Sequence, residues 1–182
     1  MAEQIRIWEG LYLQKGIRLF ASVLSAAISG MEVCPVQVEA DVSSGLPCFT
    51  MVGFPSTQVK EAQDRVRTAL KNNGISLPPK KVTVNLAPAD LRKEGAGFDL
   101  PVAAAVLAAS GFIEPQLLRN VMVVGELSLN GEVRSVSGRA AKKWIRAREL
   151  GCRYCIIPFE NLAEGALVKD MKVVGVQNIK KF

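Results

Sequence analysis

The sequence of 182 residues contains no histidine, and this absence excludes several classes of active site. Serine–histidine and cysteine–histidine relays, zinc sites built on imidazole and a histidine general base all need that side chain. Aromatic residues make up only 6% of the chain, which argues against a surface that stacks the bases of single-stranded nucleic acid. The longest apolar stretch, residues 100–112, is shorter than the roughly 20 residues of a membrane-spanning helix, so we expect no membrane partner.

The patterns that bind nucleotides and metals are missing as well. Neither Gly-x4-Gly-Lys-Ser/Thr nor Gly-x-Gly-x-x-Gly after a strand occurs, so the chain is not expected to hold ATP by itself. Cys152 and Cys155 have a CxxC spacing, but Cys34 and Cys48 are too far apart to supply the second pair of a zinc ribbon. We therefore expect no metal, no cofactor, and reduced packing cysteines in a cytoplasmic protein.

The chain has the size and composition of one globular domain. Hydrophobic residues make up 49% of the chain. A chain of this length buries enough surface to fold without disulfide bonds or a structural metal. The net charge of +6 weakly favours anionic partners such as DNA. Residues 1–18 are expected to be a leader that is disordered or adds an edge strand, and residues 19–182 form the domain.

Periodicity and capping residues predict antiparallel strands first and βαβ-like units later, which is an α+β fold. Ser56 is suited to cap a helix that ends before Gly74, and the helix over residues 100–110 is apolar nearly all round, so it should be buried. Asn130-Gly131 predicts the turn of a hairpin. The expected strands are 36–42, 48–52, 81–86, 121–125, 154–157 and 171–175, the hairpin covers 127–136, and the expected helices are 57–73, 100–110 and 138–150.

Two charged segments are candidate binding surfaces. The loop before the buried helix carries Asp90, Arg92, Lys93 and Glu94, which form either an interaction edge or a solvated connection. The basic helix over 138–150 has four cations at i, i+3, i+4 and i+7, so they share one face. That face either is solvated or follows the phosphates of DNA; its residues are Arg139, Lys142, Lys143 and Arg146. The opposite side has Ala140, Ala141, Trp144, Ile145 and Ala147, and we expect the last four of these to lie nearer the core.

Several ordered motifs carry a family resemblance. Residues 85–95 read Asn-Leu-Ala-Pro-Ala-Asp-Leu-Arg-Lys-Glu-Gly, and Phe-Asp-Leu-Pro follows at 98–101. With residues 36–42 and 45–55, they resemble the amino-terminal domain of magnesium-chelatase-like AAA ATPases of the ComM/YifB type. The hairpin at 125–134 is similar to one shared more widely, with Lon proteases and RadA-type repair proteins. The resemblance covers residues 19–182.

The resemblance implies a Lon-protease-like fold of the ribosomal S5 domain 2 type, a mixed sheet packed with helices. In the family this domain accompanies an AAA module that carries the P-loop, uses ATP and magnesium, forms hexameric rings and is associated with DNA branch migration in natural transformation. The expectation is an isolated domain or a truncated product of such a protein, since that module is not in this sequence.

The resemblance also implies that the chain is not a peptidase. Lon proteases use a Ser–Lys dyad, and the matching positions are Gly97 and Ala140. A lysine base without a hydroxyl nucleophile has nothing to activate. We therefore expect a non-catalytic accessory domain that contacts DNA or neighbouring subunits; the alternative is a protein-interaction or structural domain without affinity for nucleic acid.

Overall fold

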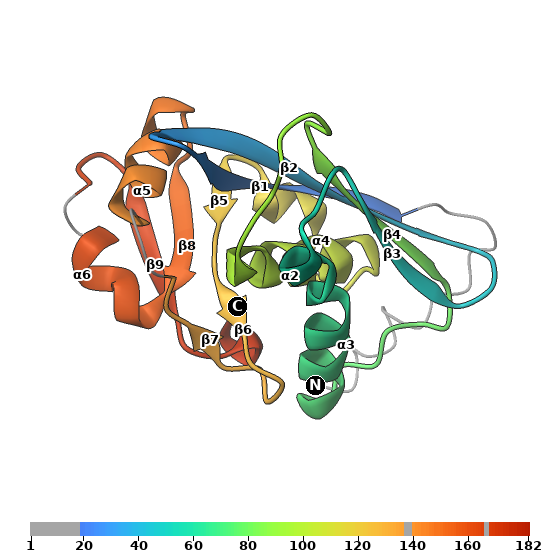
Figure 1. Ribbon diagram of the computed structural model, residues 1–182. Coiled ribbons are helices and arrows are strands. Elements are labelled where there is room, and N and C mark those ends of the chain that lie inside the picture. The colour runs from blue at the N-terminus through green and yellow to red at the C-terminus, as the bar shows by residue number, and fades with distance from the viewer. Residues whose placement is uncertain (1–18, 137–139, 166–167) are drawn as a thin grey trace.

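The computed structural model describes residues 19–136, 140–165 and 168–182, and within them seven strands form one mixed sheet (Figure 1). The predicted leader, residues 1–18, lies outside the described residues. The strand order is β3-β4-β2-β1-β5-β8-β9. The strands are β1 (Leu19–Ser29), β2 (Glu32–Ser43), β3 (Cys48–Val52), β4 (Lys81–Ala87), β5 (Val121–Val123), β8 (Tyr154–Pro158) and β9 (Lys172–Val176).

One half of the sheet consists of β1, β2, β3 and β4, and it is antiparallel as predicted except where β3 pairs with β4 in parallel. β1 pairs with β2 and β2 with β4 in antiparallel register, while β3 pairs with β4 in parallel. The alternation over 36–42 is confirmed, because Val36, Val38, Ala40 and Val42 are all buried. A period of two therefore separates the core face of β2 from its more exposed face.

The predicted helix over 57–73 consists of α2 (Thr57–Lys60) and α3 (Ala62–Asn72), divided at Glu61. Ser56 caps α2 as expected, since its Oγ accepts a hydrogen bond from the Val59 amide at 3.4 Å. At Glu61 the backbone carbonyl accepts from both Asp64 N and Arg65 N, so a tighter i+3 bond accompanies the regular i+4 bond. The buried positions of α3 face α4.

The apolar helix predicted over 100–110 is α4 (Asp99–Ala109), and all eleven of its residues are buried. It packs on β1 and β2 and against α3 (Figure 1). Each α4 side chain therefore has a protein neighbour, which explains why the sequence shows no polar stripe.

The other half of the sheet is parallel. β1, β5, β8 and β9 pair in parallel in that order, and α5 (Ala140–Glu149) and α6 (Leu162–Gly165) connect its later strands. Trp144 and Ala147 of α5 cluster with Ala26 of β1, whereas Ala27 belongs to the core around α4. Neighbouring residues of a strand point to opposite faces, so α4 and α5 cover opposite faces of the sheet. This combination confirms the α+β class.

The hairpin is present but shorter than predicted. Its strands are β6 (Glu126–Leu127) and β7 (Val133–Arg134), and Leu127 pairs with Val133. Five residues connect them, and Gly131 has φ +87°, so the turn is wider than a two-residue connection. None of the described helices is long and apolar enough to cross a membrane.

Candidate functional site

The predicted interaction loop has three exposed charges and one buried one. Asp90, Arg92 and Glu94 are exposed, and Arg92 Nε lies 3.1 Å from Glu94 Oε1. Lys93, by contrast, has no exposed surface, so its assignment to an interaction edge is wrong. The charge pattern of the loop did not reveal which side chain turns inward.

Lys93 fastens the loop to the chain that follows β3. Its Nζ donates hydrogen bonds to the carbonyl of Gly53, at 2.8 Å, and to that of Pro88. Its backbone pairs with Phe54 and Ser56 on the same segment. Burial lowers the pKa of Lys93, an effect that the charge of Asp90 opposes. A buried lysine that satisfies two carbonyls holds structure together and does not reach a partner.

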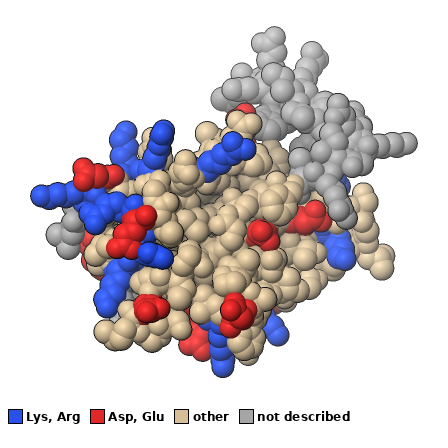
Figure 2. All heavy atoms as spheres, turned by 90° about the horizontal axis from the view of Figure 1, so that it is seen from above, with Lys and Arg blue, Asp and Glu red and all other residues tan. Residues whose placement is uncertain are grey.

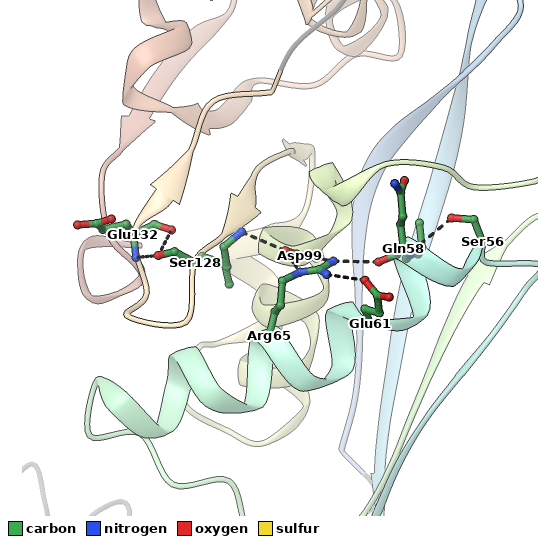
Figure 3. A network of polar contacts seen from close by, with 9 residues as sticks. Ser56, Gln58, Glu61, Arg65, Asp99, Ser128 and Glu132 are labelled. Atoms are coloured by element: carbon green, nitrogen blue, oxygen red, sulfur yellow. Dashed lines mark hydrogen bonds and ion pairs between the residues drawn. The ribbon is translucent and has the colours of Figure 1, made fainter.

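A second buried charge stands at the start of α4. Asp99 is fully buried and accepts two hydrogen bonds from Arg65 of α3, from Nε at 2.7 Å and from Nη2 at 2.9 Å (Figure 3). Its Oδ2 also accepts from the amide of Leu127 in β6 at 3.1 Å. Burial raises the pKa of Asp99, and the hydrogen bonds from Arg65 oppose that rise. One carboxylate thus joins α3, α4 and the hairpin.

Gly97, one of the predicted dyad positions, lies in η1 (Ala96–Phe98), immediately before α4. A Cβ built at Gly97 would lie 3.8 Å from Nζ of Lys143 and in ordinary contact with Val124 and Val136. The amine that reaches Gly97 therefore comes from Lys143, one helical turn after Ala140. Burial lowers the pKa of Lys143 to about 8.

Only part of the predicted DNA-contacting face of α5 is exposed to solvent. Arg139 lies outside the described residues, Lys142 is exposed, and Lys143 is half-buried and turned toward Gly97. Arg146 is half-buried, and its Nη1 donates to Glu149 Oε2 at 2.9 Å. The opposite face is buried at Trp144 and Ala147 as expected, but Ile145 is 42% exposed, so its placement toward the core is wrong.

A basic edge, which sequence reasoning missed, lies where the parallel strands begin. Arg153 N donates to the carbonyl of Asn120 at 2.9 Å, and Lys172 N donates to the carbonyl of Arg153 at 3.1 Å. The starts of β5, β8 and β9 therefore lie next to one another, and Arg119, Arg153 and Lys172 lie at or just before these starts; we call these three residues the basic edge. All three are exposed, and none has an ion-pair partner within the part of the chain that the structure describes.

The basic edge continues into the end of α5. Arg148 is exposed and stands in the last turn of that helix, and the chain then turns through Gly151 to Arg153. Figure 2 looks at the end of the molecule where these strands begin, and it shows Lys and Arg gathered on the side of α5, with acidic side chains among them. The only sequence signal for this surface was a cation at or shortly before the start of each of three strands.

The structure also bears on the cysteines and on metals. Cys152 and Cys155 are buried, and burial is the main cause that raises the pKa of the Cys155 thiol to about 12. A thiol held in its protonated form is a poor nucleophile and metal ligand, which agrees with a packing role. Among residues 19–136, 140–165 and 168–182, no three His, Cys, Asp or Glu side chains are grouped to hold a metal ion.

Comparisons with known proteins and with a family model point to the same family. Residues 38–161 match the family described as subunit ChlI of Mg-chelatase. The chain is 47% identical over 150 residues to protein YifB of Salmonella typhimurium, an alignment that covers 81% of this chain and 29% of that protein. It is 44% identical over 159 residues to competence protein ComM of Haemophilus influenzae, covering 87% and 31% of the two chains.

A more distant relative is DNA repair protein RadA of Halalkalibacterium halodurans, 32% identical over 165 residues, with coverage of 87% of this chain and 34% of that protein. The chain thus spans about a third of the length of the curated relatives that it matches.

Proposed function

The chain belongs to the family of subunit ChlI of Mg-chelatase, in the group that includes YifB and ComM, and we propose that it is a non-catalytic accessory domain of a DNA-processing AAA ATPase. Its role in this proposal is to contact the phosphate backbone of DNA. The full protein would supply the ATPase, with ATP and magnesium, and would assemble as a hexamer. The fold proposed for the domain is the Lon-like, ribosomal S5 domain 2 type.

The observation that carries the DNA contact is the basic edge. Three exposed cations lie at or just before the starts of three neighbouring parallel strands, with Arg148 in the last turn of α5 and Lys142 farther along that helix. Exposed guanidinium and ammonium groups that are not committed to ion pairs suit phosphate oxygens. Two of the relatives are named for competence and DNA repair, which supports a nucleic-acid partner.

The basic edge supports this contact better than the face of α5 that the sequence predicted. Lys143 points away from solvent toward Gly97, and Arg146 is engaged by Glu149. A phosphate contact would first have to move the Lys143 amine away from Gly97 or separate Arg146 from Glu149. Lys142 and Arg148 remain exposed on α5 and extend the proposed surface.

Fluorescence anisotropy with a labelled duplex tests the proposal. Wild-type protein should bind, with an affinity that falls steeply between about 50 and 200 mM salt, because phosphate contacts release counterions. The triple variant Arg119→Glu/Arg153→Glu/Lys172→Glu should lose at least about ten-fold in affinity at low salt, since three contacts become repulsive.

A matched control separates a local contact from a general charge effect. The variant Lys60→Glu/Arg67→Glu/Lys71→Glu has the same net charge, but its exposed substitutions lie on α2 and α3, away from the basic edge (Figure 1). It should bind nearly as wild type does. Equal losses in the two variants, or no salt-dependent binding by the wild type, would refute the DNA contact.

The second candidate function is the protein-interaction domain without affinity for DNA. The observation that favours it is a set of exposed apolar side chains on and beside β3, the last strand of the sheet on the side away from β9. Val52 is 44% exposed, Phe54 is 55% exposed, and Leu46 is 88% exposed. Absence of DNA binding, together with self-association that Phe54→Ser weakens, would favour this candidate.

A further inference from the structure

A pocket of about 480 Å³ lies beside the start of β5, and Arg119 of the basic edge is part of its lining. Its volume is within the range of small-molecule sites. We propose that this pocket binds one nucleoside monophosphate, with the base inside the pocket and the phosphate on Arg119. The ligand is either a free nucleotide or an unpaired nucleotide of a DNA strand, and in the second case the proposal rests on the DNA contact proposed above.

The alternation of β1 places part of the lining on one face of the sheet. Phe20 and Leu24 are an even number of residues apart, so they point to the same face, and Gln37 of β2 is the cross-strand partner of Leu24. Leu24 packs against the cluster that includes Trp144, so this is the face on which α5 lies. Leu150 lines the pocket and directly follows α5, so the pocket lies where that helix no longer covers the sheet.

Two of the lining residues offer apolar contacts for a nucleobase. Phe20 is 57% exposed and Leu150 is 40% exposed, so a ligand can reach both side chains. The flat face of a base stacks on an aromatic ring, and one base needs only one ring. The low aromatic content argues against a continuous stacking surface, but it is compatible with a pocket for a single base.

Amide side chains in the lining supply contacts for the polar edge of the base. They belong to Gln37, to Gln116 of η2 (Pro115–Leu118) and to Asn120. Gln37 Nε2 donates a hydrogen bond to Ser22 Oγ, which leaves the Gln37 side-chain carbonyl to accept from a ligand. Within the described ranges, no hydrogen bond occupies the side chains of Gln116 and Asn120. An amide both donates and accepts, as the edge of adenine requires.

The charge of the pocket suits a phosphate. Among the described residues of the lining, Arg119 alone is charged, so the pocket favours an anion. Arg119 is exposed and forms no ion pair within the described part of the chain, and a guanidinium binds phosphate oxygens through charge-assisted hydrogen bonds. The adjacent turn is held in place, because the carbonyl of Asn120 accepts from Arg153 N at 2.9 Å.

Saturation-transfer NMR of the whole chain with deoxyadenosine monophosphate tests the base contact. The wild type should transfer saturation to the protons of the base. Phe20→Ala should weaken binding of this nucleotide by at least about five-fold, because the stacking face is lost. Phe159→Ala is the matched control and should bind as the wild type does, since Phe159 is 49% exposed and does not line the pocket.

The phosphate contact is tested with the nucleoside and with inorganic phosphate. The wild type should bind deoxyadenosine monophosphate at least about five-fold more tightly than deoxyadenosine, and Arg119→Gln should remove this difference. Inorganic phosphate that binds as tightly as the nucleotide would overturn the contribution of the base.

Two labelled duplexes, one blunt and one with a single unpaired deoxyadenosine at a 3′ end, separate the two sources of the ligand. Tighter binding of the second duplex by at least about five-fold, lost in Phe20→Ala, identifies a nucleotide of a DNA strand. Equal binding of both duplexes, with Phe20-dependent binding of the mononucleotide, identifies a free nucleotide. The blunt duplex reports on the basic edge alone, so its failure to bind would refute the DNA contact and leave the pocket standing.

Urea unfolding establishes that each variant is folded before it is titrated. Gln116→Leu, at an exposed position of the lining, should also weaken binding of the mononucleotide, and it replaces Phe20→Ala if that variant is unfolded. Equal affinities of Phe20→Ala and Phe159→Ala for both the mononucleotide and the duplex with the unpaired nucleotide would overturn the proposal, and so would a wild type that binds deoxyadenosine monophosphate in neither form.

Discussion

Arg65 and Asp99 form a two-bond ion pair between α3 and the first residue of α4, with Nε–Oδ2 at 2.7 Å and Nη2–Oδ1 at 2.9 Å. The same guanidinium donates to the carbonyl of Gln58 at 2.9 Å, and it lies 3.4 Å from Glu61 (Figure 3). Because Asp99 is fully buried and also accepts from the hairpin, this pair fixes where α4 enters the core.

Asp99→Asn should destabilise the fold by about 2–4 kcal/mol. The amide keeps the shape of the carboxylate but leaves the Arg65 charge without its buried partner, and breaking such a pair is costly. Urea unfolding at neutral pH measures the change. Glu61→Gln is the matched control: Glu61 is 60% exposed, so its loss should cost less than about 0.5 kcal/mol. Similar costs for both substitutions would contradict the structural role of the buried pair.

Lys93→Met should cost about 2–3 kcal/mol in the free energy of unfolding. Methionine fills a similar volume but leaves the carbonyls of Gly53 and Pro88 without a donor. The adjacent substitution Arg92→Ala removes an exposed charge and should change stability by no more than about 0.5 kcal/mol. The two variants, unfolded in urea side by side, show whether the inward lysine is structural; equal stabilities would argue that it is not.

Gly53→Ala should be far more damaging than Gly74→Ala. Both glycines have positive φ, +93° and +80°, so both substitutions carry backbone strain of about 1 kcal/mol. At Gly53, however, a Cβ would lie 2.2 Å from the Leu86 carbonyl oxygen, whereas at Gly74 nothing lies within 4 Å. The prediction is a loss of more than about 3 kcal/mol at Gly53 in thermal or urea unfolding. Matching losses at both positions would show that the close approach to β4 is not needed.

The buried amine of Lys143 predicts a pH dependence of stability. Its pKa in the folded protein is about 8, below the ordinary value of 10.5, so the unfolded chain binds more protons between these values. Stability therefore rises with pH over this window, by at most about 1.4 kcal/mol per pH unit from this group. The difference in unfolding free energy between wild type and Lys143→Met, measured from pH 7 to 10, isolates it. A difference that stays constant over that range would contradict a lowered pKa.

The strongest local patterns predicted their helices and strands correctly because these patterns depend only on residues that are close in the sequence. The alternation over 36–42 becomes the two faces of β2, and the apolar run over 100–110 becomes the fully buried α4. Ser56 caps a helix because the cap bond joins residues three apart. The family resemblance, carried by long ordered motifs, is confirmed by the match over residues 38–161.

Tertiary structure decided which charged side chains face solvent. Arg92, Lys93 and Glu94 are consecutive charges in a loop, and only the approach of Gly53 explains why Lys93 alone is buried. Likewise Lys142 and Lys143 are equivalent in a helical pattern, but the segment at Gly97 packs over one of them. Helical spacing predicts which side chains share a face of the helix, but it does not predict which face another part of the fold covers.

The basic edge is the clearest case of this kind. Arg119, Arg153 and Lys172 are separated by many residues, and each looks like an isolated surface charge in the sequence. They come to one end of the sheet because β5, β8 and β9 run parallel, so that the starts of these strands lie next to one another. The sequence by itself determined the elements and the family, through short-range periodicity and motif order. The sheet register decided the proposed binding surface, because pairing between distant strands depends on the whole fold.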